Sequence, residues 1–144
     1  MSFGILPEYT SDARNGRRFP SLCRVSSELV AIIGGSIQET QYLQSCLLYN
    51  LANESVSALP HLNQKRRTSS SCFLDNKLYT FCGRSEHGYL NTIEMLAMDP
   101  SSGHQGNNNW RLLQGVYPSV LKARANCIAC PINASEIVIM GGYN

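Results

Sequence analysis

The sequence predicts an all-β fold made of repeated units, and two observations support that prediction. First, three stretches share one order of features: an arginine, a short strand containing a cysteine, a polar turn, an apolar strand and a glycine. These stretches are residues 17–35, 66–84 and 124–144. Second, the cysteine and the last glycine are 12, 11 and 12 residues apart in the pairs Cys23–Gly35, Cys72–Gly83 and Cys130–Gly142. Self-similarity of this kind indicates internal repetition.

The stretch 124–144 shows the unit most clearly and is typical of a β-hairpin. We expect its first strand, its turn and its second strand at residues 126–130, 131–135 and 136–140. The β-branched residues 137–139 fit a pleated, buried surface. The doublet Gly141-Gly142 suits a backbone that needs positive φ or a close approach by another segment.

Two more strands are expected after each of the first two hairpins. They are residues 42–50 and 56–59 in the first unit, and residues 90–98 and 110–113 in the second. Residues 3–6 match 110–113 by their distance from the next arginine, so they are expected to be the last strand of a preceding unit. The Gly/Asn/Ser-rich segment 100–109 is expected to be an inserted loop.

These elements divide the chain into a preceding last strand with its linker (1–16), two four-stranded units (17–65 and 66–123) and the first hairpin of another unit (124–144). The last glycines of the units are 48 and then 59 residues apart. Four antiparallel strands in about 50 residues are typical of one blade of a β-propeller. No helix of consequence is expected.

On these residues the units resemble Kelch repeats. Gly34-Gly35 and Gly141-Gly142 match the family's glycine doublet, and Cys82-Gly83 matches it with a cysteine in the first place. Tyr49 matches the aromatic residue of the third strand, and Trp110 matches the tryptophan of the fourth. The resemblance covers residues 3–144 and implies a Kelch-type propeller segment of about two and a half blades, hence an incomplete ring.

An open array of blades leaves sheet edges and an apolar face uncovered. Three interpretations follow: the chain is a fragment of a longer propeller, it closes a ring with copies of itself, or it completes the propeller of another chain. The start within one blade and the end after a second strand favour the fragment. Further blades in cis, or self-association, are therefore expected.

Composition and charge argue against several classes of protein. The net charge of +2 is too small to indicate binding to nucleic acid or an anionic membrane. No apolar run of 18 residues and no secretory signal is evident, so we expect a cytoplasmic protein without a transmembrane helix.

The cysteines and histidines indicate no metal or cofactor. In a reducing compartment, cysteines at repeated strand positions are expected to be buried free thiols, namely Cys23, Cys72, Cys82 and Cys130. Cys127 and Cys130 are three residues apart in a strand, so they are expected to point to opposite faces and not to share a metal. The three histidines, His61, His87 and His104, lack ligand spacing.

The candidate binding residues lie after the glycines and before the arginines, which a four-stranded meander places on one face. They are rich in arginine and tyrosine, which are common binding anchors, and arginine binds carboxylates bidentately. We therefore predict contacts with a partner protein or peptide carrying Asp or Glu. The predicted face contains Arg18, Gln38, Glu39, Arg66, Arg67, Arg84, Glu86, His87, Tyr89, Arg124 and Tyr143.

The repeated arginines have a second interpretation, in which they brace the units by bonding to backbone carbonyls or to a carboxylate such as Glu94. The resemblance implies a protein–protein interaction module, the recognition part of a larger adaptor or scaffold, and not an enzyme. The alternative is a fragment of a catalytic Kelch propeller of the sugar epimerase or copper oxidase type. An epimerase would need an acid/base pair and a copper oxidase convergent His and Tyr ligands, and no such set is apparent.

Overall fold

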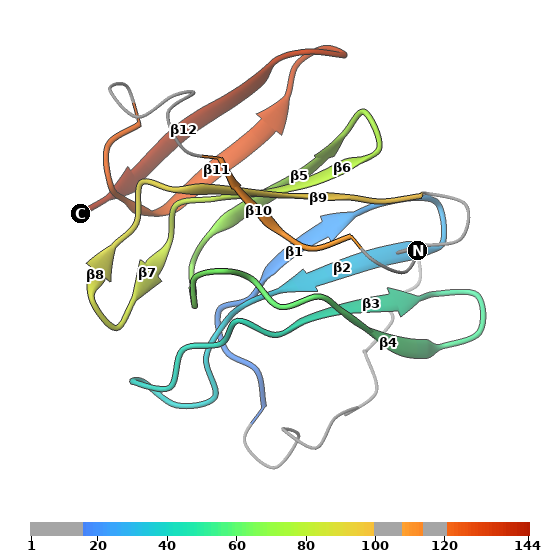
Figure 1. Cartoon of the computed structure of the whole chain (residues 1–144), viewed down its shortest axis with the longest axis horizontal. Coiled ribbons are helices and arrows are strands. Elements are labelled where there is room, and N and C mark those ends of the chain that lie inside the picture. Colours follow the sequence, from blue (N-terminus) through green and yellow to red (C-terminus); the bar gives the residue numbers. More distant parts are fainter. Residues whose placement is uncertain (1–15, 100–107, 114–120) are drawn as a thin grey trace, which may run out of the picture.

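The computed structural model describes residues 16–99, 108–113 and 121–144. Over these ranges the chain is all-β and forms two four-stranded antiparallel sheets and two hairpins (Figure 1). The smaller hairpin has strands of only two residues each. The prediction of four-stranded antiparallel units is therefore confirmed, and no sheet formed by the described strands closes on itself. The described ranges contain no helix long and apolar enough to cross a membrane. The strand expected at residues 3–6 and most of the loop at 100–109 lie outside the described residues.

The first sheet contains β1 (Ser21–Arg24), β2 (Leu29–Ile33), β3 (Cys46–Asn50) and β4 (Ser55–Leu59), in that order. Consecutive strands are neighbours, as short connections dictate. The turn between β1 and β2 closes on the Ser26 hydroxyl, which accepts the N–H groups of Glu28 and Leu29 at 3.2 Å each. β3 begins four residues later than predicted, because Tyr42 instead forms an isolated bridge with Ser36.

The second sheet contains β5 (Ser70–Leu74), β6 (Lys77–Phe81), β9 (Ile93–Ala97) and β10 (Arg111–Leu113), in the spatial order β10-β9-β6-β5. The turn between β5 and β6 is Asp75-Asn76, with φ values of 50° and 53°. Two such residues in succession form the hairpin turn whose twist matches the strands. A small hairpin, β7 (Arg84–Ser85) with β8 (Gly88–Tyr89), lies between β6 and β9 and was not predicted.

The last hairpin contains β11 (Ala125–Pro131) and β12 (Ile137–Tyr143). Its second strand runs through the glycine doublet and does not end before it, because Gly141 pairs with Cys127 and Tyr143 with Ala125. Gly142 has φ of +84°, and a Cβ there would lie 2.7 Å from the Ala125 carbonyl oxygen. Gly142 is therefore a site of close backbone approach, and Gly141 has a positive φ of +67°, so the doublet meets the two conditions that were predicted.

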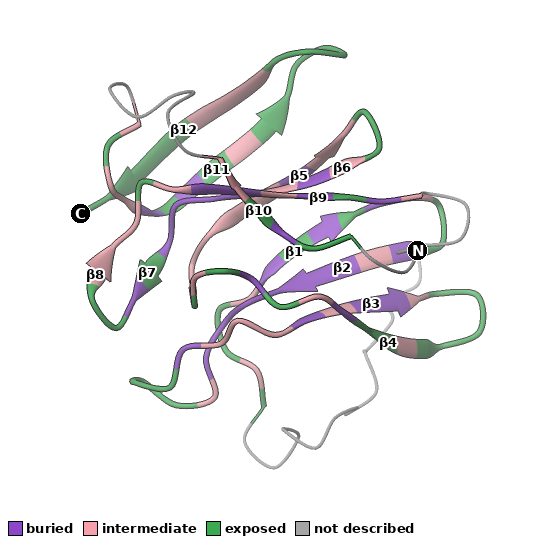
Figure 2. Cartoon of the chain, viewed as in Figure 1, coloured by how far each residue is buried: buried purple, intermediate pink, exposed green. Residues whose placement is uncertain are grey.

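The core consists of two apolar layers between three stacked elements, with β5 lying between β1 and β11. The first layer joins the two large sheets and includes Ile33, Leu48, Leu78, Leu96 and Trp110. The second layer joins the second sheet to the last hairpin and contains Cys72, Phe81, Cys82, Ile93 and Cys127. Buried residues dominate β2 and β3, whereas β11 and β12 are mostly exposed or half-buried (Figure 2).

The cysteine prediction is right for Cys23, Cys72 and Cys82, which are buried free thiols, and wrong for Cys130, which is exposed. Cys130 pairs with Val138, just as Cys23 pairs with Ala31, so the register is repeated. It is exposed because no sheet of the described chain covers the outer face of the last hairpin. Cys127 lies on the opposite face and is buried, as the strand alternation predicted.

Candidate functional site: a repeated arginine and an arginine–aromatic face

The structure contains one arginine contact that recurs in all three units. Each Nη1 donates to the carbonyl oxygen of the first residue of the glycine doublet, or of its Cys82 counterpart. The distances are 2.6 Å from Arg17 to Gly34, 2.8 Å from Arg66 to Cys82 and 2.9 Å from Arg124 to Gly141. A charged donor makes such hydrogen bonds strong. This contact ties the start of each hairpin to its end, so these arginines brace the units.

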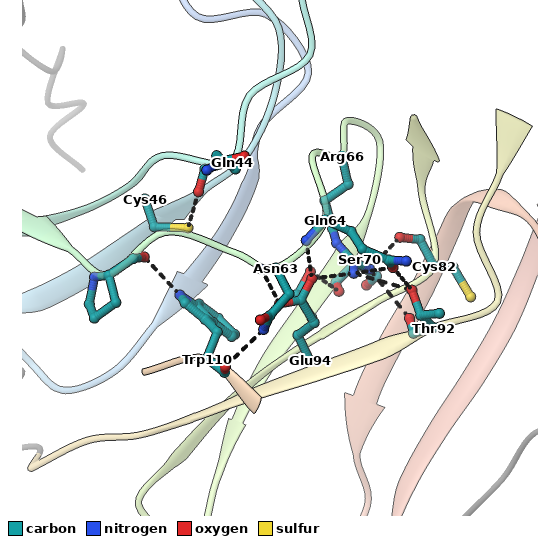
Figure 3. A network of polar contacts seen from close by, with 12 residues as sticks. Gln44, Cys46, Asn63, Gln64, Arg66, Ser70, Cys82, Thr92, Glu94 and Trp110 are labelled. Atoms are coloured by element: carbon teal, nitrogen blue, oxygen red, sulfur yellow. Dashed lines mark hydrogen bonds and ion pairs between the residues drawn. The ribbon is translucent and has the colours of Figure 1, made fainter. Parts of the chain in front are cut away.

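Arg66 is the most deeply buried of the three and belongs to a polar network (Figure 3). Its Nη2 lies 2.6 Å from Glu94 Oε1, and neither side chain is exposed to solvent. Glu94 also accepts the backbone N–H groups of Asn63 at 2.6 Å and Gln64 at 3.1 Å. Burial lowers the pKa of the Arg66 guanidinium, and the Glu94 carboxylate opposes that shift. The charged pair is thus held by several hydrogen bonds, as a buried ion pair requires.

This network corrects the assignment of Arg66 to the binding face. The side chain has no exposed surface, because the second sheet and the link from β4 to β5 enclose it. Asn63 extends the network by donating its Nδ2 to the Trp110 carbonyl at 2.8 Å, and the Trp110 indole donates to the Pro60 carbonyl at 3.0 Å. For Arg66 the bracing interpretation therefore holds, with Glu94 as its carboxylate.

The segments before the arginines and after the glycines lie side by side, as the meander predicted. Isolated bridges join Arg18 to Ser36 and Arg67 to Arg84. Successive units are also linked in series at one repeated position. The N–H of Thr68 donates to the Phe19 carbonyl at 3.0 Å, and the N–H of Asn126 donates to the Thr68 carbonyl at 2.9 Å. These three residues have φ values of 53°, 52° and 56°, a conformation uncommon for residues other than glycine.

Arg67, a residue of the predicted binding face, contacts two aromatic rings with its guanidinium group. Its guanidinium carbon lies 4.9 Å from the centre of the Tyr42 ring and 5.6 Å from that of Phe19. Its Nη1 also donates to the Glu39 carbonyl at 3.1 Å. Cation–π contacts of this kind hold a guanidinium in place while leaving its edge able to bind. Phe19 is 57% exposed, which is unusual for a phenylalanine.

A second cation–aromatic group lies on the same face, between the second sheet and the last hairpin. The Arg84 guanidinium carbon is 5.6 Å from the centre of the Tyr89 ring, and Tyr89 meets Tyr143 edge to face at 6.0 Å. The Tyr143 hydroxyl accepts a hydrogen bond from Asn126 Nδ2 at 3.0 Å. Tyr143 is 60% exposed and Arg84 is exposed. We call the six residues of the two groups the arginine–aromatic face: Phe19, Tyr42, Arg67, Arg84, Tyr89 and Tyr143.

The remaining predicted residues surround this face or lie beside it. Arg18, Gln38, Glu39 and His87 are exposed in the connecting segments. Glu86 forms a surface ion pair with Lys65 at 3.5 Å, and such exposed pairs contribute little stability. Arg124 is half-buried, at the edge of the last hairpin. In the ranges that the structure describes, no three His, Cys, Asp or Glu side chains gather as a metal site.

Sequence reasoning missed Phe19 and Tyr42, which complete the stack on Arg67. Phe19 directly follows Arg17-Arg18, at the position equivalent to Thr68 and Asn126, so its place in the repeat was a usable signal. Tyr42 was predicted to begin a strand, and it was therefore not included in the binding face. No protein-family model matches the sequence. The functional argument therefore depends on the geometry of the arginine–aromatic face.

Proposed function

We propose that this chain is a segment of a Kelch-type β-propeller that acts as a protein–protein interaction module. Three features support the proposal. The two complete units have four antiparallel strands in meander order. The first strands of all three units, β1, β5 and β11, lie next to one another, and an equivalent arginine braces each unit. Radial repetition of such sheets is the principle of a propeller. The intact protein would use this segment to recognise a substrate or partner within a larger adaptor or scaffold.

The observation that carries the proposal is the pair of guanidinium groups on the arginine–aromatic face. The Arg67 guanidinium lies over two aromatic rings and that of Arg84 over one, and the Arg84 guanidinium makes no hydrogen bond or ion pair to any other described residue. A guanidinium held by a ring presents a planar fork that matches a carboxylate. Arginine and tyrosine are also, with tryptophan, the residues enriched in binding hot spots. An acidic segment of a partner protein is therefore the ligand that this face fits.

Binding of a fluorescently labelled acidic peptide, compared with the same peptide carrying Asn and Gln in place of Asp and Glu, tests this proposal. We expect the acidic peptide to bind, and the double substitution Arg67→Gln with Arg84→Gln to weaken it at least tenfold, since a hydrogen bond to a charged group contributes about 1.5–3 kcal/mol. Arg24→Gln is the matched control, because Arg24 is exposed on β1 and its Nε bonds only locally, to the Ser26 carbonyl.

Equal binding of the acidic and amide peptides would overturn the proposal. So would an affinity that the double substitution leaves at the level of the Arg24→Gln control.

A further inference from the structure

Two cysteines occupy positions where the other units have different residues. Cys82 replaces the first glycine of the doublet, at the position of Gly34 in the first unit. Cys127 lies three residues after its arginine, where the other units have Pro20 and Ser69. Both cysteines belong to the apolar layer between the second sheet and the last hairpin. This boundary therefore carries a pair of thiols that the repeat itself does not require.

The backbone of Cys82 is held in an unusual conformation. Its φ is 57°, which is uncommon for a residue other than glycine. Its N–H donates to the Thr92 carbonyl at 3.0 Å, and its carbonyl accepts Arg66 Nη1 at 2.8 Å (Figure 3). At the equivalent Gly34, a Cβ would lie 2.4 Å from the Arg66 carbonyl oxygen. Cys82 thus places a side chain where the first unit has no room for one, and such exceptions are found most often at functional sites.

The two thiols meet across the boundary. The Cys82 thiol donates a hydrogen bond to the sulfur of Cys127. The backbones beside them are joined as well, because the N–H of Gly83 donates to the Arg124 carbonyl at 2.9 Å. Both thiols are free. A disulfide forms only between side chains that approach each other closely, and this contact brings the two sulfur atoms together.

The environments of the two thiols differ in a way that suits two different roles. The hydrogen bond from Cys82 lowers the pKa of Cys127, and the charge of Arg124 acts in the same direction, although burial opposes both. The same hydrogen bond raises the pKa of Cys82, and burial adds to the increase. Cys127 therefore has more thiolate character, and Cys82 keeps its proton. The thiolate is the form of cysteine that acts as a nucleophile.

Cys127 also has access to solvent that Cys82 lacks. Cys82 is completely enclosed, whereas Cys127 is 6% exposed and lines an open pocket of about 340 Å³. A molecule as small as hydrogen peroxide can reach a thiol at the wall of such a pocket, whereas bulkier thiol reagents are hindered. Two consecutive residues from each unit line the pocket, namely Phe19 and Pro20, Thr68 and Ser69, and Asn126 and Cys127.

We propose that Cys127 and Cys82 form a peroxide-sensitive dithiol, in which Cys127 is the nucleophile and Cys82 is the resolving thiol. The Cys127 thiolate attacks one oxygen of hydrogen peroxide and breaks the O–O bond, which leaves a sulfenic acid on Cys127. The other oxygen departs as hydroxide and takes a proton from solvent to become water. An accessible thiol of lowered pKa beside a resolving cysteine is the usual arrangement of a redox sensor.

The second step joins the two cysteines. The Cys82 sulfur attacks the Cys127 sulfur, the S–S bond forms and the S–O bond breaks. The departing hydroxyl group leaves as water with the proton of Cys82. Overall the two thiols lose two electrons and hydrogen peroxide is reduced to two molecules of water. In a reducing compartment such a disulfide is transient, as expected of a sensor.

The disulfide would fasten the second unit to the last hairpin, beside one group of the arginine–aromatic face. Cys82 is two residues before Arg84, and Cys127 follows Asn126, which donates to the Tyr143 hydroxyl. The inference goes beyond the proposed function, because it depends on the two thiols and not on an acidic partner.

Peptide mapping of the oxidised chain tests the inference. The Cys130→Ser chain is the starting material, because Cys130 is exposed and lies in the same tryptic peptide as Cys127. The folded chain is treated with hydrogen peroxide at neutral pH, quenched with acid, denatured, blocked with N-ethylmaleimide and digested with trypsin. We expect a disulfide between the peptides 78–84 and 125–144, and its loss on treatment with dithiothreitol.

Two further substitutions separate the roles of the two thiols. With Cys82→Ser the reaction should stop at the sulfenic acid of Cys127, which dimedone traps and mass spectrometry detects. With Cys127→Ser, Cys82 should remain a thiol, because it is enclosed and protonated. Circular dichroism of each variant establishes that the sheet structure is retained.

Cys72 is the matched control, since it is a buried thiol of the same apolar layer. Burial raises the pKa of Cys72 to about 11. We therefore expect hydrogen peroxide to consume the Cys72 thiol at least about tenfold more slowly than that of Cys127, because its thiolate fraction is much smaller.

Three results would overturn the inference. They are a Cys127 that stays a thiol in the oxidised chain, equal rates of loss for Cys72 and Cys127, and a disulfide that forms as fast in the denatured chain as in the folded one. Failure of the acidic peptide to bind would overturn the proposed function alone, because the mass of the disulfide-linked peptides does not depend on peptide binding.

Discussion

The hairpins β1–β2 and β11–β12 have the same strand register and opposite burial. Ile33 is completely buried, whereas its equivalent Met140 is 57% exposed. Cys23 is buried, whereas its equivalent Cys130 is exposed. The difference arises because the second sheet covers the outer face of the first hairpin and no described element covers that of the last. A strand's register is thus a local property of the repeat, but burial depends on the unit that follows.

The repeated arginines show the same contrast. Arg66 and Arg124 donate to equivalent backbone carbonyls at nearly equal distances, 2.8 and 2.9 Å. Arg66 is fully enclosed and paired with Glu94, whereas Arg124 is only half-buried. Both contacts brace their units, but that of Arg66 belongs to an enclosed network and that of Arg124 lies at the edge of the last hairpin.

The largest effect that follows from this contrast concerns the buried ion pair. Arg66→Gln leaves the Glu94 carboxylate buried without its cation, so we expect the free energy of unfolding to fall by about 3–5 kcal/mol. Arg124→Gln removes a contact at an exposed edge and should cost less than about 1.5 kcal/mol. Urea unfolding of both variants, followed by circular dichroism, measures the difference. Equal losses of unfolding free energy would show that the two arginines stabilise the fold to the same extent.

A smaller effect is expected from the apolar equivalents Ile33 and Met140. Ile33→Ala removes a completely buried side chain and should destabilise the fold by about 2–5 kcal/mol, through lost transfer energy and the cavity left behind. Met140→Ala should change stability by no more than about 0.5 kcal/mol, because the side chain is mostly in water. Thermal unfolding of the two variants compares them. A large loss for Met140→Ala would mean that another chain covers this face in solution.

The smallest change concerns reactivity and leaves stability almost untouched. A thiol reagent at pH 8 should modify Cys130 in the native chain before any other cysteine, because it is exposed. Burial raises the pKa of Cys23 and of Cys46 to about 12, so these thiols are both inaccessible and protonated at that pH. Mass spectrometry of the digested protein identifies the modified residue, and the Cys130→Ser variant is the control. Rapid native modification of Cys23 would contradict the packing of the two sheets.

Much of the fold could be predicted from the sequence because its information is local. Short apolar runs separated by turn residues such as Asp75-Asn76 indicated the strands, and the nearly constant cysteine–glycine spacing indicated the repeat. The brace from an arginine to the glycine doublet also spans only 16 or 17 residues within one unit. The small hairpin β7–β8 was missed, because two-residue strands have no periodic pattern to detect.

The candidate site was predicted only in outline. The sequence placed Arg67, Arg84 and Tyr143 on one face, but the rings that hold Arg67 come from Phe19 and Tyr42, in the preceding unit. It also left open whether Arg66 braces the fold or contacts a partner, since both need the same guanidinium. The enclosure of Arg66 with Glu94 required contacts across links of about 30 residues, which no local pattern encodes.

By itself, then, the sequence determined the strands, the turns and the repeated register, because each depends on neighbouring residues and on the period of the chain. Only the tertiary structure decided which equivalent positions are buried and which face solvent. Cys23 and Cys130 have the same local surroundings, yet one lies beneath a second sheet and the other on an open face. Burial removes a side chain from water only where another element packs against it, so stacking, and not local pattern, determined which of the two cysteines is exposed.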